Sequence, residues 1–150
     1  MKVSLAPQTI SSSIPDAIDY LRVDKHIQFL DSEATTQFIR VFDKLFDLLN
    51  SRNAYSTVFK SPLSLSNFHY WNNVFNNSEI YIRSLTCKGI PILNHRRKVC
   101  ALGFLIDIKS IRELALELLC NIENPLKYFL TYKTLSHRII FLLSSIALWF

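Results

Sequence analysis

Glycine is scarce in this sequence: only Gly89 and Gly103 occur among its 150 residues. A Walker-type phosphate loop needs several closely spaced glycines, because its backbone N–H groups must surround the phosphates. That kind of nucleotide cradle is therefore excluded. Any nucleotide site in this chain must instead use side chains and the N-termini of helices.

Cysteine is also sparse. Cys87, Cys100 and Cys120 are odd in number and widely spaced, and no pair of Cys or His residues has zinc-finger spacing. We therefore expect buried free thiols in a reducing compartment. The N-terminus lacks the basic and apolar regions of a secretory signal, so we expect no export.

Acidic residues are missing from the end of the sequence, where none follows Glu123. That end cannot supply the carboxylates that two-metal phosphoryl chemistry requires. The formal charge of +5 permits contact with nucleic acid or nucleotide phosphates, but the basic residues are spread along the chain. With 49% hydrophobic residues, the chain is long enough for one domain with a core.

Three apolar stripes at helical spacing, separated by loops that carry proline or glycine, predict an all-α fold, a helical bundle. The long helices are expected at about Ser32 to Asn50, Asn67 to Thr86 and Leu102 to Leu119. A shorter helix is expected from about Ser13, with Pro15 in its first turn. Lys88 to Val99 is expected to be a loop.

The stretch Ser32 to Asn53 is typical of one amphipathic helix that runs into a polar stop. Ser32 or Asp31 can cap its start. Asp47 and Asn50 are three residues apart, so they leave the same face of the last turns. A carboxylate and an amide placed together can read a hydrogen-bonding base edge, although residues at a helix end are more often simply solvated.

Three other segments each carry two interpretations. The aromatic face of Asn67 to Thr86 fits a core better than a base-stacking platform, because an exposed aromatic row would be a large apolar patch. The run His95 to Lys98 fits solvated surface, with phosphate or DNA contact as the alternative. Ile139 to Phe150 is nearly all apolar but shorter than the roughly 20 residues that cross a bilayer, so part of a larger core is favoured over a tail anchor.

The motif F-D-K-L-F-D-L-L-N-S-R-N, with S-E-A-T-T ahead of it, resembles a segment of the P-element-type transposases, the family that includes the THAP-type zinc-finger transposases. In that family the segment lies in a GTP-binding insertion domain, which interrupts an RNase H-like catalytic domain. The opening M-K-V-S-L and the later G-F-L-I-D-I-K-S-I are similar too, and the resemblance fades after Tyr132. Pro7 and Pro15 depart from the family's pattern and would kink or shorten its first helix.

The resemblance implies two regions: residues 1–124 as the insertion domain, and residues 125–150 as a degenerate start of the C-terminal part of the RNase H-like domain. The family continues there with Ser-Gln-Asp-His and a catalytic Glu, whereas this chain reads L-S-H-R-I-I-F-L-L-S-S-I. Ile140 stands where the metal-binding Glu is expected. We therefore expect no catalytic activity from this chain, because isoleucine cannot hold a hard cation.

The resemblance also implies GTP as a positioning cofactor that is not hydrolysed for strand transfer. The implied cofactor-binding residues are Lys2, Val3, Ser11, Phe46, Asp47 and Asn50. Lys2 and Val3 would lie near the phosphates, Ser11 would add a hydroxyl, and Phe46 would pack on the guanine. Asp47 and Asn50 would read the edge of the base. Whether Mg²⁺ accompanies the GTP stays open, because the family's magnesium-linked Asp is absent.

Three functions therefore remain in competition. The first is a GTP-binding insertion domain of a nuclear transposase, with transposon DNA as a partner of the full-length protein and with oligomers allowed. The second is an inactive or domesticated transposon remnant that binds proteins or DNA and has lost the nucleotide. The third, a membrane-associated helical protein, depends only on the apolar end, and we expect no membrane contact.

Overall fold

The computed structural model describes residues 11–132. By the density of its internal contacts the chain divides into two compact units, Met1–Phe46 and Asp47–Phe150, which are described separately. Helices dominate both units, and the described strands form a single two-stranded sheet in the second unit. The all-α fold class predicted from the sequence is therefore confirmed.

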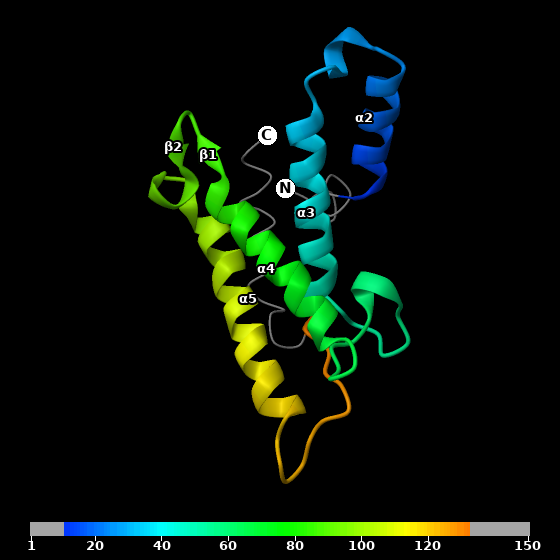
Figure 1. The fold of residues 1–150 in the computed structure, drawn as a ribbon, viewed down its shortest axis with the longest axis vertical. Helices are drawn as coiled ribbons and strands as arrows, with labels where there is room; N and C mark the ends of the chain where they lie inside the picture. The colour runs from blue at the N-terminus through cyan, green and yellow to red at the C-terminus, as the bar shows by residue number, and fades with distance from the viewer. Residues whose placement is uncertain (1–10, 133–150) are drawn as a thin grey trace, which may run out of the picture. The chain divides into compact units, whose positions relative to one another are not determined.

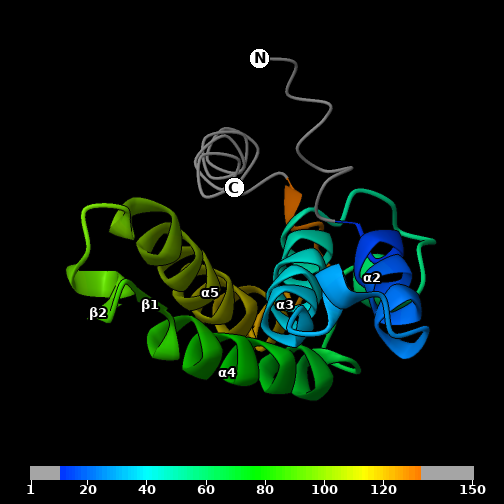
Figure 2. The ribbon, with the colours of Figure 1, turned by 90° about the horizontal axis from the view of Figure 1, so that it is seen from above.

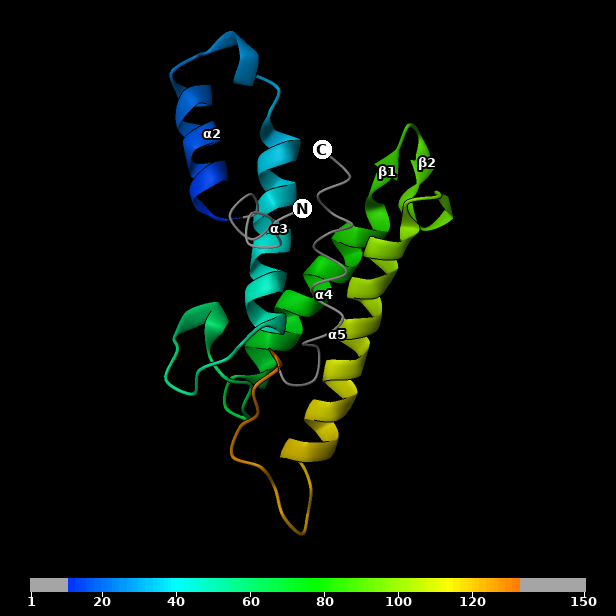
Figure 3. The ribbon, with the colours of Figure 1, turned by 180° about the vertical axis from the view of Figure 1, so that it is seen from behind.

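The first unit contains α2 (Ser13–Val23), the 3-10 helix η1 (Ile27–Phe29) and the larger part of α3 (Glu33–Leu49). Figure 3 shows α2 and α3 running antiparallel, with η1 at the turn between them. Arg40 of α3 holds the pair together, because its Nη2 donates to Asp16 Oδ1 at 2.8 Å and to Asp19 Oδ2 at 2.7 Å. Both acceptors lie on α2, so one guanidinium bridges two turns of the neighbouring helix.

The end of α2 shows a geometry that usually calls for glycine. Lys25 has a φ of 59°, and the N–H groups of Lys25 and His26 donate to the carbonyls of Arg22 and Leu21 at 3.1 Å each. These two bonds form the Schellman motif, which satisfies the last helical carbonyls and normally places glycine at the left-handed position. A lysine there keeps the bonds but adds backbone strain.

The second unit contains an antiparallel helical hairpin. α4 (Phe68–Ser84) is followed by strands β1 (Thr86–Cys87) and β2 (Ile90–Pro91), the 3-10 helix η3 (Ile92–Asn94) and α5 (Lys98–Leu119). Figures 1 and 2 show α4 and α5 side by side, with the β1–β2 turn at the end where α4 finishes and α5 begins. Trp71, Phe75 and Ile82 of α4 are completely buried, which confirms that its aromatic face is core.

An ionic network joins α4 to α5. Arg112 Nη1 donates to Glu79 Oε2 at 3.2 Å, and Arg83 Nη2 donates to Glu79 Oε1 at 2.9 Å. Chiefly through the bond from Arg83, the pKa of the Glu79 carboxyl is lowered from its ordinary value. Arg112 also lies over the ring of Phe75, with 5.9 Å between its Cζ and the ring centroid. One arginine thus makes polar and aromatic contacts across the helix pair.

The region Lys88 to Val99, expected as a loop, is more regular than the sequence indicated. Lys88 and Gly89 both have positive φ, 53° and 78°, and form the two-residue turn between β1 and β2. This is the turn that matches the twist of a β-hairpin. Helix α5 also begins at Lys98, four residues before the expected Leu102. The other helix boundaries lie within two residues of expectation.

The expectation of buried thiols is right for one cysteine only. Cys100 is buried, Cys87 is half-buried and Cys120 is exposed, and the described residues contain no disulfide. Burial raises the pKa of the Cys100 thiol to about 12. In residues 11–132 no helix is both long enough and apolar enough to span a membrane. The apolar segment Ile139 to Phe150 and Ile140 lie outside the described residues.

Candidate functional site

The C-terminal end of α3 carries the carboxylate singled out by the sequence. The Asp47 side chain is 22% exposed, and its Oδ1 lies 3.6 Å from Nζ of Lys60. Burial raises the pKa of the Asp47 carboxyl above its ordinary value, and the positive charge and hydrogen bond of Lys60 oppose that shift. The folded chain therefore holds a partly desolvated carboxylate that Lys60 compensates incompletely.

Asn50 follows the last residue of α3 and lies beside Asp47. Its backbone N–H donates to the Asp47 carbonyl at 3.3 Å. Its side-chain Oδ1 accepts a hydrogen bond from Nε of Arg52 at 2.9 Å, which orients the amide. Asp47 thus lies in the last turn of α3, and the backbone of Asn50, just after the helix, is bonded to it.

A threonine from a distant part of the sequence closes this end of α3. Thr131 is fully buried. Its Oγ1 donates to the Leu48 carbonyl at 2.6 Å and accepts from the Ser51 N–H at 3.1 Å. One hydroxyl therefore satisfies two backbone groups that the helix end would otherwise leave without partners. It also fixes where the chain turns away after Asn50.

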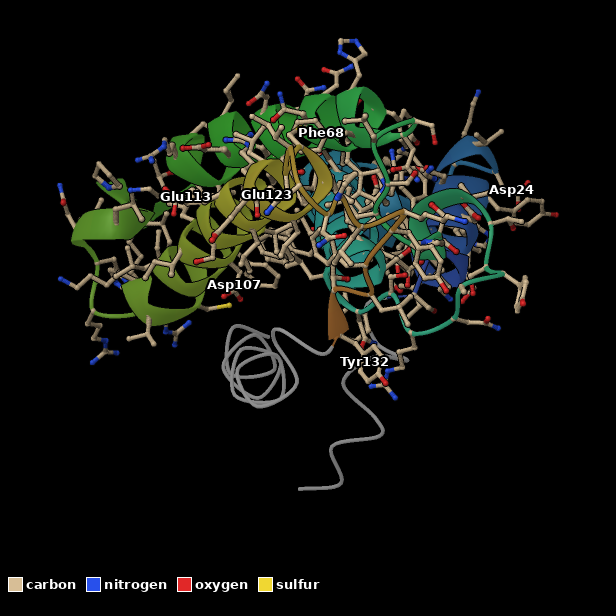
Figure 4. The ribbon with its side chains drawn as sticks, turned by 90° about the horizontal axis from the view of Figure 1, so that it is seen from below. Asp24, Phe68, Asp107, Glu113, Glu123 and Tyr132 are labelled. Atoms are coloured by element: carbon tan, nitrogen blue, oxygen red, sulfur yellow. The ribbon has the colours of Figure 1, made fainter. Side chains whose placement is uncertain are left out.

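The segment around Thr131 is itself held against the loop that carries Lys60. Leu63 and Phe129 form an antiparallel bridge with N–O distances of 3.1 and 2.9 Å. The N–H of Tyr132 donates to the Ser51 carbonyl at 3.3 Å, and the Ser51 hydroxyl donates to the Lys60 carbonyl at 2.9 Å. Figure 4 labels Tyr132 at the end of this segment. Segments about 80 residues apart in the sequence therefore build the surroundings of Asp47.

The loop before Lys60 contains a strained residue. Val58 begins the 3-10 helix η2 (Val58–Lys60) with a φ of 56°, a conformation that β-branched residues rarely adopt. The Ser61 hydroxyl donates to the Val58 carbonyl at 2.7 Å and so holds this conformation. Because η2 ends at Lys60, the strained turn helps to set where the ammonium group meets Asp47.

The remaining expected residues are placed as follows. Phe46 is half-buried and directly precedes Asp47 on α3. Ser11 lies before α2, where its Oγ is 2.7 Å from Oγ of Ser13. Ser11 and Phe46 belong to the first unit, and Asp47 and Asn50 belong to the second. Lys2 and Val3 lie outside the described residues.

Sequence reasoning missed Lys60 and Thr131. Neither has a local signal, because each reaches the end of α3 through tertiary folding. Ser32, offered as a helix cap, donates its hydroxyl to the Phe29 carbonyl at 2.6 Å. Its side chain therefore ties α3 to η1.

The arrangement suits recognition of a planar group that donates hydrogen bonds. A carboxylate accepts through both oxygens, and an asparagine amide adds two N–H donors and one acceptor oxygen. The Asp47 carboxylate already draws a donor, Lys60, and Asn50 is oriented by Arg52. Among residues 11–132, no group of three or more His, Cys, Asp or Glu side chains is placed to hold a metal ion.

Comparison with known proteins shows which family this chain resembles. Residues 1–62 match the family model described as a TNP-like, GTP-binding insertion domain, and that range includes Phe46, Asp47 and Asn50. This match supports the resemblance to P-element-type transposases that the motifs indicated. Its relative DNA transposase THAP9 from Homo sapiens is 31% identical to it over 134 residues, or 89% of this chain. The chain spans 15% of the length of that relative, and no solved structure matches it.

Proposed function

We propose that this chain binds GTP through the end of α3, as a positioning cofactor for DNA transposition, without catalysing a reaction. The observation that carries the proposal is the partly desolvated Asp47 carboxylate beside Asn50, within the range that matches a GTP-binding insertion domain. Guanine presents two adjacent N–H groups on one edge, and a carboxylate accepts both. Binding would relieve the cost that burial places on the Asp47 charge.

The other residues take supporting roles in this proposal. Phe46, next in sequence to Asp47, offers an aromatic face to the base, and the Asn50 amide contacts the same edge. Lys2, Val3 and Ser11 contact the phosphates, and any Mg²⁺ is held through phosphate oxygens and water. Within the full-length transposase, the nucleotide orders the surface that meets transposon DNA in the nucleus.

A competing function has one observation in its favour. Lys60 lies against the Asp47 carboxylate, and Arg52 Nε donates to the side-chain Oδ1 of Asn50, so both recognition groups have internal partners. A remnant that had lost the nucleotide would keep such contacts as ordinary surface structure. The two functions differ in one measurable property, which is the affinity of the chain for GTP relative to ATP.

Calorimetric titration with GTP and ATP tests the proposal. The parent chain should prefer GTP by about ten- to hundredfold, because loss of a charge-assisted hydrogen bond in a sheltered site costs about 1.5 to 3 kcal/mol. Asp47→Ala should erase this preference. Lys2→Ala should weaken both nucleotides alike, since a lysine on phosphates does not contact the base. Absence of GTP binding at millimolar nucleotide would leave the remnant as the better account.

A further inference from the structure

The hairpin end of the α4–α5 pair lacks acidic side chains. No Asp or Glu occurs between Glu79 and Asp107, which spans the end of α4, both strands, η3 and the first turns of α5. Five exposed cations lie within this stretch. Arg83 pairs with Glu79, and the other four together are called the basic pole here. They are Lys88, Arg96, Arg97 and Lys98.

The fold gathers these four side chains at one end of the helix pair. Lys88 occupies the turn between β1 and β2, and the other three immediately precede or begin α5. The N–H of Ile92 donates to the Leu85 carbonyl at 2.8 Å, which ties η3 to the end of α4. His95 Nδ1 accepts from the Arg97 N–H at 3.2 Å and fixes the approach to α5. Figure 4 shows nitrogen-tipped side chains around this end.

Among residues 11–132, the basic pole lacks the ion pairs that six other cations make, and Lys25, Arg52 and Lys127 lack them too. Six cations elsewhere lie within 4.0 Å of a carboxylate: Arg22, Arg40, Lys60, Arg83, Lys109 and Arg112. Among residues 11–132, none of the four cations of the basic pole has an ion pair. Their charge is therefore left for an external partner.

The start of α5 also places positive charge where a helix disfavours it. The N-terminus of a helix carries a partial positive charge, so acidic residues are the usual choice in the first turn. Helices α2 and α3 follow this rule with Asp16 and Glu33, whereas α5 begins with Lys98 directly after Arg97 and has no acidic residue in its first turn. A bound polyanion would turn this local repulsion into attraction.

We propose that the basic pole binds the phosphate backbone of duplex DNA. Two adjacent arginines can each hold a phosphate through paired N–H groups, and the flanking lysines add charge. The choice of DNA over other polyanions rests on the proposed function in transposition. The binding of a polyanion itself rests on the charge of the basic pole. The binding is independent of base sequence, because these contacts reach phosphates and no base edges.

Fluorescence anisotropy with a labelled 20-base-pair duplex of arbitrary sequence tests this surface. The basic-pole variant carries Lys88→Gln, Arg96→Gln, Arg97→Gln and Lys98→Gln. The control variant removes the same charge at four exposed lysines elsewhere, through Lys25→Gln, Lys44→Gln, Lys109→Gln and Lys127→Gln. A third variant with Arg96→Lys and Arg97→Lys keeps the charge. Circular dichroism compares the helicity of all variants.

The parent should lose roughly hundredfold in DNA affinity between 50 and 200 mM salt, as four phosphate contacts predict from a slope of about −0.9 per contact. The basic-pole variant should bind at least about tenfold more weakly than the control variant and have a shallower slope. The lysine-for-arginine variant should retain most of the binding. Equal weakening in the basic-pole and control variants would overturn the proposal, as would capture of phosphatidylserine vesicles without duplex binding.

GTP titration of the same variants separates this inference from the nucleotide site. The basic-pole variant should bind GTP as the parent does, because its substitutions leave the end of α3 unchanged. If no variant binds GTP while the DNA results hold, only the nucleotide proposal fails. If GTP binding is intact and the DNA results fail, only the basic pole is rejected.

Discussion

The ammonium group of Lys60 lies 3.6 Å from the carboxylate of Asp47, and the two side chains differ sharply in exposure, at 64% and 22%. The lysine is free to leave, whereas the carboxylate is held at the end of α3. Such a pair contributes little stability, because an exposed ammonium is well solvated whether paired or not. Lys60 therefore acts as a replaceable partner that a guanine edge can displace.

The first prediction concerns this displacement. Lys60→Met should raise GTP affinity about two- to fivefold, because the base no longer competes with an ammonium group for the Asp47 carboxylate and exposed pairs are worth up to about 1 kcal/mol. Calorimetry on the variant and on a matched Lys127→Met control measures the effect. A fall in affinity specific to Lys60→Met would show that Lys60 itself holds the nucleotide.

The second prediction concerns the pH dependence of stability. Burial raises the pKa of Asp47 in the folded state above its ordinary value of 3.8. The folded state therefore binds this proton more tightly than the unfolded chain does, so this group costs stability as pH rises from that value through the folded pKa. Asp47→Asn removes the titration. The free energy of unfolding of the variant minus that of the parent should therefore grow with pH.

Urea denaturation at several pH values between about 4 and 7 measures this difference. Asp43→Asn is the control, because it also replaces one carboxyl group of α3 with an amide. If the Asp47→Asn difference shrinks as pH rises, the Lys60 pair outweighs burial, and the carboxylate is stabilised in the folded chain.

The third prediction tests the support of the site. Thr131→Val keeps the shape of the side chain but removes the hydroxyl that contacts Leu48 and Ser51. Two buried backbone groups then lose their partner, which should cost about 1 to 3 kcal/mol in unfolding free energy. Thr35→Val, at an exposed position of α3, should change stability by less than about 0.5 kcal/mol. Equal losses of unfolding free energy in the two variants would show that Thr131 does not support the end of α3.

The fourth prediction concerns the end of α2. Lys25→Gly should raise the unfolding free energy by about 0.5 to 1 kcal/mol, because glycine adopts the positive φ at this position without strain. Lys44→Gly, within α3, should instead lower it by about 1 kcal/mol, since glycine weakens a helix interior. Thermal unfolding of the two variants should show shifts of opposite sign. A downward shift for Lys25→Gly would show that the lysine makes a contact worth more than the strain.

The apolar stripe of α3 shows how far the sequence could predict this fold. Phe42, Leu45 and Leu49 recur at helical spacing, and all three are buried. The polar run from Asn50 correctly marked the helix end, because short polar residues compete for backbone hydrogen bonds. Periodicity reports local structure well wherever one face of a helix is buried.

Two structural features were predicted wrongly because their local sequence signals are weak. The Lys88-Gly89 turn lacks the Asn-Gly or Asp-Gly pair that usually marks a hairpin, so the region was predicted as a loop. The start of α5 was predicted late because Arg97 and Lys98 are unfavourable at a helix N-terminus. Three-dimensional contacts decide both features.

The candidate site also combines features that the sequence predicts with features that it does not. The spacing of Asp47 and Asn50 predicted that they lie close together, and the Asn50 N–H does bond to the Asp47 carbonyl. The approach of Lys60 and the closure by Thr131 depend on loop geometry and on a segment far along the sequence. Burial of Asp47, and with it the direction of its pKa shift, was for that reason beyond prediction from the sequence.

The central claim is that the Asp47 carboxylate reads the two N–H donors of guanine, and inosine triphosphate tests it most directly because it lacks only the 2-amino group. By calorimetry the parent should bind GTP about tenfold more tightly than inosine triphosphate, and inosine triphosphate more tightly than ATP, following the number of donors presented. In Asp47→Ala the three affinities should converge while helicity is unchanged. Equal affinities of the parent for all three nucleotides, or the same order in Asp47→Ala, would contradict the claim.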